Sequence, residues 1–258
     1  MQWGHIKTLF ILSFLILNIY LITALIDRQQ DIGYLDNREL PIEDQLAAAG
    51  INYDSIQVDV TQSTYISAGQ KELTDEDLSA LEGFQNQSIE VLTDNLIVSE
   101  LKQPIGITKK MGAKEFESII QSNVLYGEEY SFWDWSEELK VLIFFQVKED
   151  RMIYFNENGL LLLFVNDRNE ITHYAQTILG ESVVQGEPVQ LNQPTQVIGQ
   201  FFNANYLNRG DEVTDLKIGY YSRIAAEGTH VFAPTWKVTV NDERSHFVNA
   251  IEGIIYEN

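Results

Sequence analysis

The chain has 258 residues, a length that suits a membrane anchor followed by one or two folded modules. Hydrophobic residues make up 45% of it, which is enough for a packed core. The formal net charge of -21 disfavours contact with phosphate backbones, so nucleic acid is not an expected partner. Cysteine is absent, which excludes disulfides, thiolate metal sites and cysteine nucleophiles.

An uncharged apolar segment occupies residues 8–26 and reads TLFILSFLILNIYLITALI. As a helix it would span about 28 Å, close to the ~30 Å hydrocarbon layer of a bilayer. Its apolar region is longer than that of most cleaved signal peptides, and no small-x-small cleavage pattern follows it. We therefore predict a single transmembrane helix at residues 8–26, in contact with the lipid bilayer.

Charges beside this segment predict its orientation. Lys7 lies on the short N-terminal side, whereas Asp27 and Arg28 on the other side cancel each other. The positive-inside rule then places residues 1–7 in the cytoplasm and the rest of the chain outside the cell membrane. Residues 27–40 are polar and read as a linker to an extracytoplasmic body.

The body begins with a predicted short helix over residues 41–49. Proline opens it and Gly50 closes it, which is the usual placement of these two residue types around a helix. Alternating Ile and Val residues then predict a strand within residues 56–66.

A second helix is predicted over residues 74–83. Thr74 is a suitable N-cap, with Asp77 three residues further on, and a glycine stops the helix. The next hydrophobic segment, residues 89–98, fits either a strand or a frayed helix, and the sequence leaves both open.

A clearer pattern starts at Ala113, where apolar residues recur on one face of a helix that ends near Gly127. The Asn158-Gly159 pair is a strong hairpin signal between the two strands that flank it. The strands predicted in this part of the chain are 130–135, 141–147, 151–155, 160–165 and 171–178.

The last part of the chain repeats this order with a helix over residues 196–205. Strands follow at 216–223, 230–232, 235–240, 246–250 and 254–256. Each part also contains an aromatic–Asn–Gly element after its helix and first strands, YFNENG at 154–159 and FVNAIEG at 247–253. We predict an α+β fold of two related modules, 41–178 and 179–258, each with one helix packed on an antiparallel sheet.

Catalytic and metal-binding patterns are not evident. The histidines of the body lack ligand spacing, and no nucleophile-elbow, phosphate-loop or dinucleotide fingerprint is present. Adjacent acidic pairs such as Glu128-Glu129 and Glu137-Glu138 point to opposite faces of a strand, which does not suit joint acid–base work. The many aromatic residues suit core filling better than a glycan or peptide groove. We expect no enzyme activity, no cofactor and no metal ion.

Several stretches resemble the YycI (WalI) family of Firmicutes, in the order in which that family has them. They are the N-terminal FILSFLILNIYL, VLYGEEYSFWDW at 124–135, MIYFNENG at 152–159, IGYY at 218–221, APTWKV at 233–238 and FVNAIEG at 247–253. The resemblance covers the anchor and about residues 113–258, whereas residues 30–112 are less distinctive.

The resemblance implies a regulator rather than an enzyme. YycI-type proteins act with a YycH-type sister protein beside WalK (YycG), the sensor kinase of the WalK/WalR (YycG/YycF) two-component system that controls cell-wall metabolism. Their membrane helices contact those of the kinase, so Ser13, Phe14 and Asn18 are the candidate contact residues here. A buried amide such as Asn18 would gain ~0.6 kcal/mol, and up to 1–2, from an interhelical hydrogen bond. The alternative is an Asn that the apolar helix merely tolerates.

A different function remains open on the residues alone. The body would then be an extracytoplasmic binding module for a peptide or a wall fragment, and the apolar helix would serve only as a tether. A ligand-dependent rise in the thermal stability of the body distinguishes this alternative from regulation by membrane contact.

Overall fold

The computed structural model describes the following residues: 14, 17, 18, 40–93, 96–108, 110–226 and 228–256. Within them the chain has the predicted α+β class, with four α-helices and one large sheet of thirteen strands. None of the helices in these ranges is both long enough and apolar enough to cross a bilayer. The predicted membrane segment lies outside the described residues except for Phe14, Leu17 and Asn18, which are helical.

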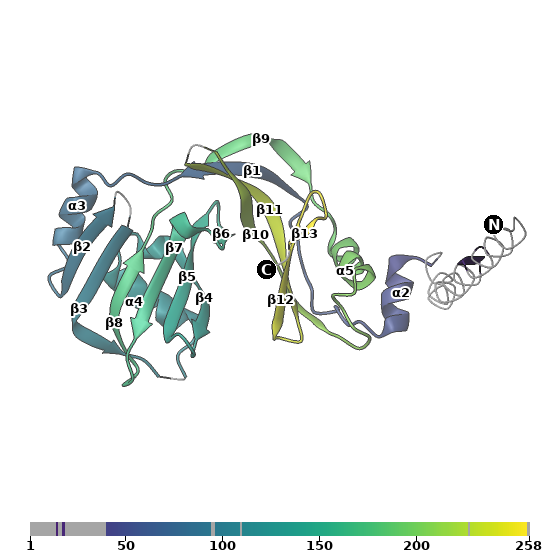
Figure 1. Ribbon diagram of the computed structural model, residues 1–258, viewed down its shortest axis with the longest axis horizontal. Coiled ribbons are helices and arrows are strands. Elements are labelled where there is room, and N and C mark those ends of the chain that lie inside the picture. The colour runs from purple at the N-terminus through teal and green to yellow at the C-terminus, as the bar shows by residue number, and fades with distance from the viewer. Residues whose placement is uncertain are drawn as a thin grey trace, which may run out of the picture.

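The strands and helices gather in two lobes, which lie side by side along the long axis of the molecule (Figure 1). In the first lobe the strands run antiparallel in the order β4-β5-β7-β8-β3-β2. They are β2 (Gln87–Thr93), β3 (Leu96–Gly106), β4 (Tyr130–Ser136), β5 (Val141–Lys148), β7 (Leu160–Val165) and β8 (Glu170–Gln176). Two helices, α3 (Asp75–Glu82) and α4 (Ala113–Asn123), contribute Leu81, Phe116 and Ile120 to the core of this lobe.

The second lobe joins the last part of the chain to the first part of the body. Its sheet runs β13-β12-β11-β10, and β1 pairs with the start of β11 and with β9. The strands are β1 (Gln62–Gly69), β9 (Val183–Gln190), β10 (Val213–Ala226), β11 (Thr229–Val240), β12 (Arg244–Asn249) and β13 (Ile255–Tyr256). Helix α2 (Ile42–Ala49) packs against α5 (Pro194–Asn203), and both contribute to one core with this sheet.

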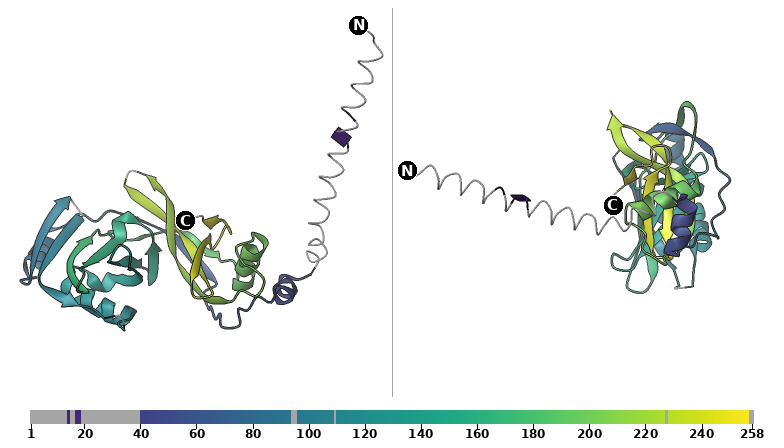
Figure 2. Two further views of the ribbon diagram at one scale, coloured as in Figure 1. Left: turned by 60° about the horizontal axis from the view of Figure 1, so that its bottom comes forward. Right: turned by 90° about the vertical axis from the view of Figure 1, so that its right-hand side faces the viewer.

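The packing therefore groups residues 42–69 with the C-terminal elements and not with the first lobe. The division of the body into modules 41–178 and 179–258 stays a prediction. In Figure 2, α2 lies at the end of the second lobe that faces away from the first lobe.

Strand β6 (Arg151–Tyr154) joins the two lobes. It pairs antiparallel with the end of β5 and parallel with β10, where Tyr220 faces Ile153 and Tyr221 faces Tyr154. The predicted hairpin around Asn158-Gly159 is wrong, because β6 and β7 both pair with β5 rather than with each other. The Asn-Gly pair lies instead in a short 3-10 helix, η3 (Glu157–Gly159), that carries the chain from one partner of β5 to the other.

Local signals account for the helices that were predicted correctly. Gly50 ends α2 in the left-handed conformation, with φ of 72°, which costs glycine no steric strain. Thr74 caps α3 by accepting a hydrogen bond from the Asp77 amide at 3.2 Å, while the Asp77 carboxylate accepts one from the Thr74 amide at 2.9 Å.

The extended segments agree less well with their predictions. The first strand begins at Gln62, later than predicted, and the described residues of the segment 89–98 belong to the antiparallel strands β2 and β3. Strand β9 was not predicted. All eight of its side chains are exposed, so it lacks the alternation of buried and exposed residues that marks a strand in sequence.

Candidate functional site

Strand β4 carries a bulge that divides its aromatic residues between two faces. Its pairing with β5 shifts register between Phe132 and Asp134. In a regular strand Trp133 and Trp135 would share a face, but the bulge reverses the alternation. Phe132 and Trp135 consequently pack on the core of the first lobe, whereas Trp133 packs on the cluster that faces the second lobe.

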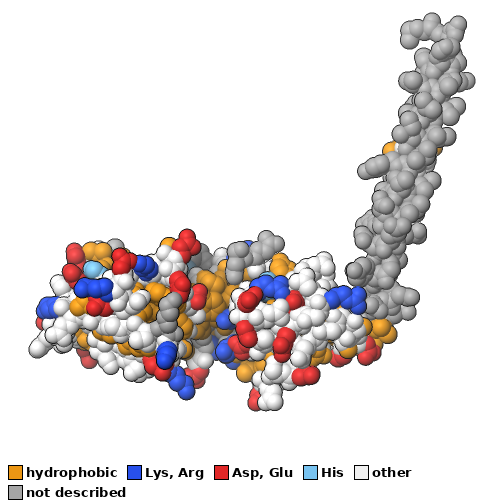
Figure 3. Space-filling view, turned by 90° about the horizontal axis from the view of Figure 1, so that it is seen from below, with side chains coloured by type: hydrophobic (Ala, Val, Ile, Leu, Met, Phe, Trp, Pro, Cys, Tyr) orange, Lys and Arg blue, Asp and Glu red, His pale blue; other side chains and the backbone are white. Residues whose placement is uncertain are grey.

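On the second of these faces, Trp133 is the centre of an aromatic junction between the lobes. Its ring lies 5.3 Å from Phe145, 5.4 Å from Phe155 and 6.0 Å from Phe247, measured between ring centroids. Aromatic pairs at these separations stabilise a structure beyond the area that they bury. Figure 3 shows hydrophobic side chains gathered on the surface between the two lobes.

A lysine completes the junction. The Lys237 ammonium lies 4.4 Å from the centre of the Trp133 ring, within the range of a cation–π contact. Burial lowers the pKa of Lys237 below its ordinary value. Phe155, by contrast, is 45% exposed, so the junction is open to solvent on one side.

A glycine allows the strands of the two lobes to meet at this junction. A Cβ atom on Gly219 would lie 2.4 Å from the Tyr154 ring and 2.7 Å from the carbonyl oxygen of Met152. Neither distance is sterically possible, so β10 reaches β6 only with glycine at this position. A second contact between the lobes involves His230. Its two ring nitrogens form hydrogen bonds with the side-chain amides of Asn156, at 3.2 Å, and Asn158, at 2.9 Å.

The sequence stretches that carry the family resemblance converge on this junction. Trp133 belongs to VLYGEEYSFWDW, Tyr154 to MIYFNENG and Gly219 to IGYY, while Lys237 and Phe247 belong to APTWKV and FVNAIEG. Sequence reasoning noted these stretches but could not bring them together, because the contacts join residues that lie far apart in the chain.

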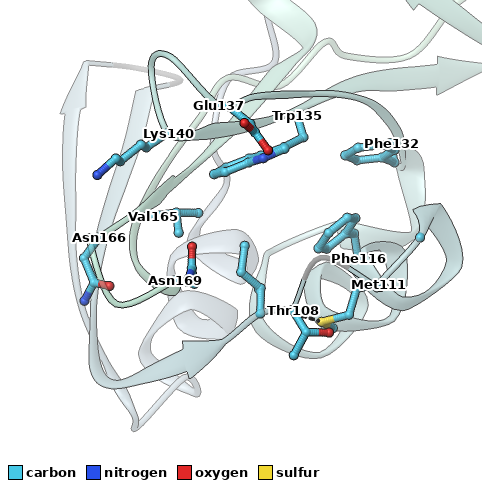
Figure 4. A pocket seen from close by; sticks show the side chains of 12 residues that line it. Thr108, Met111, Phe116, Phe132, Trp135, Glu137, Lys140, Val165, Asn166 and Asn169 are labelled. Carbon is cyan, nitrogen blue, oxygen red and sulfur yellow. Dashed lines mark hydrogen bonds between the residues drawn. The ribbon is translucent and has the colours of Figure 1, made fainter.

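On its other face, β4 borders a cavity of about 470 Å3 in the first lobe. Figure 4 shows Phe116 from α4, Phe132 and Trp135 from β4, and Met111 around it, with the Asn169 amide directed toward its centre. Phe116 and Phe132 are in ring contact, with centroids 5.1 Å apart. A volume of this size lies within the range of small-molecule sites.

The aromatic residues of the body differ in their burial. Trp236, Tyr220 and Phe201 are buried, as core filling predicts. Trp133 and Trp135 are only half-buried, because they form the walls of the junction and of the cavity.

The predicted membrane-contact residues are only partly described. Ser13 lies outside the described residues. Phe14 is 60% exposed, and the side-chain amide of Asn18 donates a hydrogen bond to the Phe14 carbonyl at 2.8 Å. That bond occupies one of the two N–H groups of the Asn18 amide. Their role in contact with a partner remains a proposal.

Among the described residues, each lobe has a buried aspartate that holds a loop in place. Burial alone would raise the pKa of Asp77, but hydrogen bonds from Tyr126 and Thr74 and the nearby Lys71 charge outweigh it and lower this pKa to about 2. Burial likewise opposes ionisation of Asp211. Hydrogen bonds from the Asn208 amide, the Asn241 side chain and Arg244 nevertheless lower its pKa to about 2 as well.

Groups of metal-ligating residues do not occur in the part of the chain that the structure describes. His246 contacts the Tyr206 ring edge-to-face with centroids 5.1 Å apart, and burial lowers the pKa of His246. Of the acidic pairs, Glu129 is engaged structurally, since its carboxylate accepts hydrogen bonds from Gln146 at 2.8 Å and Lys148 at 2.9 Å.

The fold and the junction define a two-lobed α+β protein whose lobes meet through aromatic residues on β4, β6 and β12. A family model described as "YycI protein" matches residues 29–251. The chain belongs to the YycI family, which confirms the resemblance predicted from sequence.

This family has a role in regulation of the WalK/YycG two-component system, a membrane-associated signalling system, and it is not known as an enzyme family. The chain therefore has a regulatory role linked to that kinase system. Its membrane topology and its individual partner contacts are taken up as proposals below.

Comparison with solved structures gives weak backbone similarities. An uncharacterized protein from Eubacterium rectale matches at a TM-score of 0.46 with 10% identity, over 81% of this chain and 89% of that one. The C-terminal domain of Bacillus megaterium YpeB matches at 0.40 with 10% identity, over 72% and 97%. Neither likeness bears on function. A sequence comparison with curated proteins gave no match.

Proposed function

We propose that the chain is a single-pass membrane protein whose body lies outside the cytoplasm and which modulates a WalK (YycG)-type sensor kinase. In this proposal residues 8–26 cross the bilayer, and the body associates with a YycH-type partner. The observation that carries the proposal is the match of the YycI family over residues 29–251. The uncharged apolar sequence of residues 8–26 supports the anchor.

Modulation of this kind needs contact rather than chemistry. A kinase that alternates between two states shifts toward the state that a partner binds better. A difference in binding free energy of about 1–3 kcal/mol produces a change of roughly 5- to 150-fold. A helix contact that includes Ser13, Phe14 and Asn18 is of this size, since one interhelical hydrogen bond contributes ~0.6 kcal/mol and packing adds to it.

Phe14 and Asn18 are suitably placed for such a contact. They are four residues apart and therefore lie on one face of a helix. Phe14 presents most of its side chain, at 60% exposure, and the Asn18 amide is held beside it by the hydrogen bond to the Phe14 carbonyl. The pair thus offers an apolar surface next to a polar group.

The test replaces residues 8–26 with an unrelated transmembrane helix of equal length in cells that depend on the kinase system. We expect kinase output to change as it does in a deletion of the gene, while the body still folds and still co-purifies with a YycH-type partner. A second variant, Asn18→Leu, should weaken co-purification with the kinase.

Unchanged kinase output after the helix replacement would contradict the proposal, provided that the replaced protein is present in the membrane fraction at its usual level. If only Asn18→Leu is silent, the amide is a bystander and the contact depends on the apolar side chains.

A further inference from the structure

The cavity beside β4 has the composition of a binding site for one bulky apolar group. Its volume is about 470 Å3, and its walls come from Phe116, Phe132, Trp135, Met111 and Val165. Phe116 and Val165 are buried while the rim residues Thr108 and Asn169 are exposed, so the cavity has an apolar floor and a mouth open to solvent. Sites for small molecules combine an apolar lining with a few polar groups in this way.

The polar groups directed to the cavity are uncharged. Figure 4 shows the Asn169 amide pointing toward its centre and Thr108 at its edge. Within the described part of the chain, neither the Asn169 side chain nor the Thr108 hydroxyl makes a hydrogen bond, whereas the Asn166 amide is engaged with Glu170 at 2.8 Å. An amide both donates and accepts hydrogen bonds, so it is complementary to another amide.

The charged residues of the rim do not favour an ionic head group. Lys140 pairs with Asp167 and points away from the cavity, and Glu137 lies on the side of Trp135 (Figure 4). These positions favour a ligand that is neutral where it meets the rim.

The cavity is also remote from the start of the body. It lies in the first lobe, whereas α2 lies at the far end of the second lobe (Figures 1 and 2). The cavity and α2 thus lie at opposite ends of the described body.

From these observations we infer that the cavity binds a peptide or peptide-like molecule. A bulky apolar, preferably aromatic, side chain enters between Phe116, Phe132 and Trp135. The backbone amide beside that side chain bonds to Asn169 and Thr108 at the mouth. This inference does not depend on the proposed function, since the cavity can bind a peptide whether or not the membrane helix contacts the kinase.

The test uses the full chain in lipid nanodiscs and the photo-probe N-acetyl-p-benzoylphenylalanine amide, which carries an aromatic ketone and a peptide amide. After irradiation, mass spectrometry locates the adduct. We expect labelling at Met111 and its neighbours, and loss of labelling when N-acetylphenylalanine amide competes. The anionic analogue 4-benzoylbenzoate, which lacks the peptide amide, should label the same residues less well, by about five- to tenfold for one lost hydrogen bond.

Two variants with matched controls sharpen the result. Thr108→Trp places an indole in the mouth and should abolish labelling, whereas Thr61→Trp, on an exposed residue of the second lobe, should not. Asn169→Gly removes the amide yet suits the left-handed backbone there, with φ of 58°, and should weaken labelling by about five- to tenfold. Asn205→Gly makes the same change at a left-handed Asn of the second lobe and should have no effect.

Three results would overturn the inference. One is labelling spread over the surface with none at the cavity. Another is equal labelling of the Thr108→Trp and Thr61→Trp proteins. Equal labelling by the neutral and anionic probes would refute the peptide class even if the cavity is occupied.

Discussion

Both lobes consist of helices packed on antiparallel strands, but they differ in how tightly the helices are packed. In the second lobe α2 lies against α5 so closely that a Cβ atom on Gly199 would meet Ile42 at 2.3 Å. In the first lobe the start of α4 borders a cavity of about 470 Å3 instead. Close packing of this kind fixes a helix in place, whereas a cavity leaves room for a ligand. The comparison therefore sets a tightly packed helix pair in the second lobe against a cavity beside a helix in the first.

The largest effect is expected at the junction that joins the lobes. Trp133→Ala removes the ring that touches Phe145, Phe155 and Phe247, and should lower the free energy of unfolding by about 3 kcal/mol. Trp135→Ala makes the same change two residues away, where the ring faces a cavity, and should cost about 1 kcal/mol. Denaturation in urea, followed by circular dichroism, measures both.

Equal losses for these two substitutions would contradict the division of β4 into a packed face and an open face. A control is Trp236→Phe in the core of the second lobe, which keeps a large ring at a fully buried position and should leave cooperative unfolding intact.

The next effect is a loss of stability at low pH, to which both lobes should contribute. Asp77 and Asp211 each have a pKa lowered to about 2, so each stabilises the fold fully above about pH 4. That stabilisation, roughly 2 kcal/mol for each residue, should be lost as the pH falls from about 4 to about 2. Thermal unfolding measured across this range tests the expectation.

Single substitutions assign the acid effect to a lobe. Asp77→Asn should lower stability at pH 7 and remove the part of the acid dependence that arises in the first lobe, and Asp211→Asn should do the same for the second. An acid dependence that persists unchanged in the double variant would show that other carboxylates cause it.

The smallest effects on stability are expected from substitutions that enlarge one side chain in each lobe by a single carbon atom, and the two effects have opposite signs. Gly199→Ala should lower stability by about 1 kcal/mol, because a clash of about 2 kcal/mol with Ile42 outweighs a gain of about 1 kcal/mol in helix propensity. Val165→Ile extends a buried side chain into the cavity and should raise stability by about 0.5 kcal/mol. Differential scanning calorimetry resolves such shifts, and a loss from both substitutions would mean that the cavity is not free to be filled.

The comparison also shows which features the sequence predicts. Helices α2 and α3 were predicted within a residue or so, since Gly50 and the Thr74–Asp77 pair are local signals that act within one helical turn. Most strands were predicted from hydrophobic alternation. Strand β9 was not predicted, because all its side chains are exposed. The Asn158-Gly159 hairpin was predicted wrongly, because a turn signal does not specify which strands pair.

The candidate sites were less predictable than the fold. The aromatic residues were recognised, but their division between junction and cavity depends on one bulge between Phe132 and Asp134, which period-two alternation does not contain. The approach of β10 to β6 over Gly219 is likewise a contact between distant parts of the chain. Such contacts follow from tertiary packing, so a single sequence gives no local sign of them.

The proposed regulation by contact in the membrane is tested most directly by crosslinking from the helix itself. A photo-crosslinking residue placed at Phe14 or Asn18 in living cells should capture the WalK-type kinase. The same residue at Ile16, about half a turn away on the predicted helix, should capture it much less. Equal capture from all three positions, or none from Phe14 and Asn18 in a protein that fractionates with the membrane, would contradict the account.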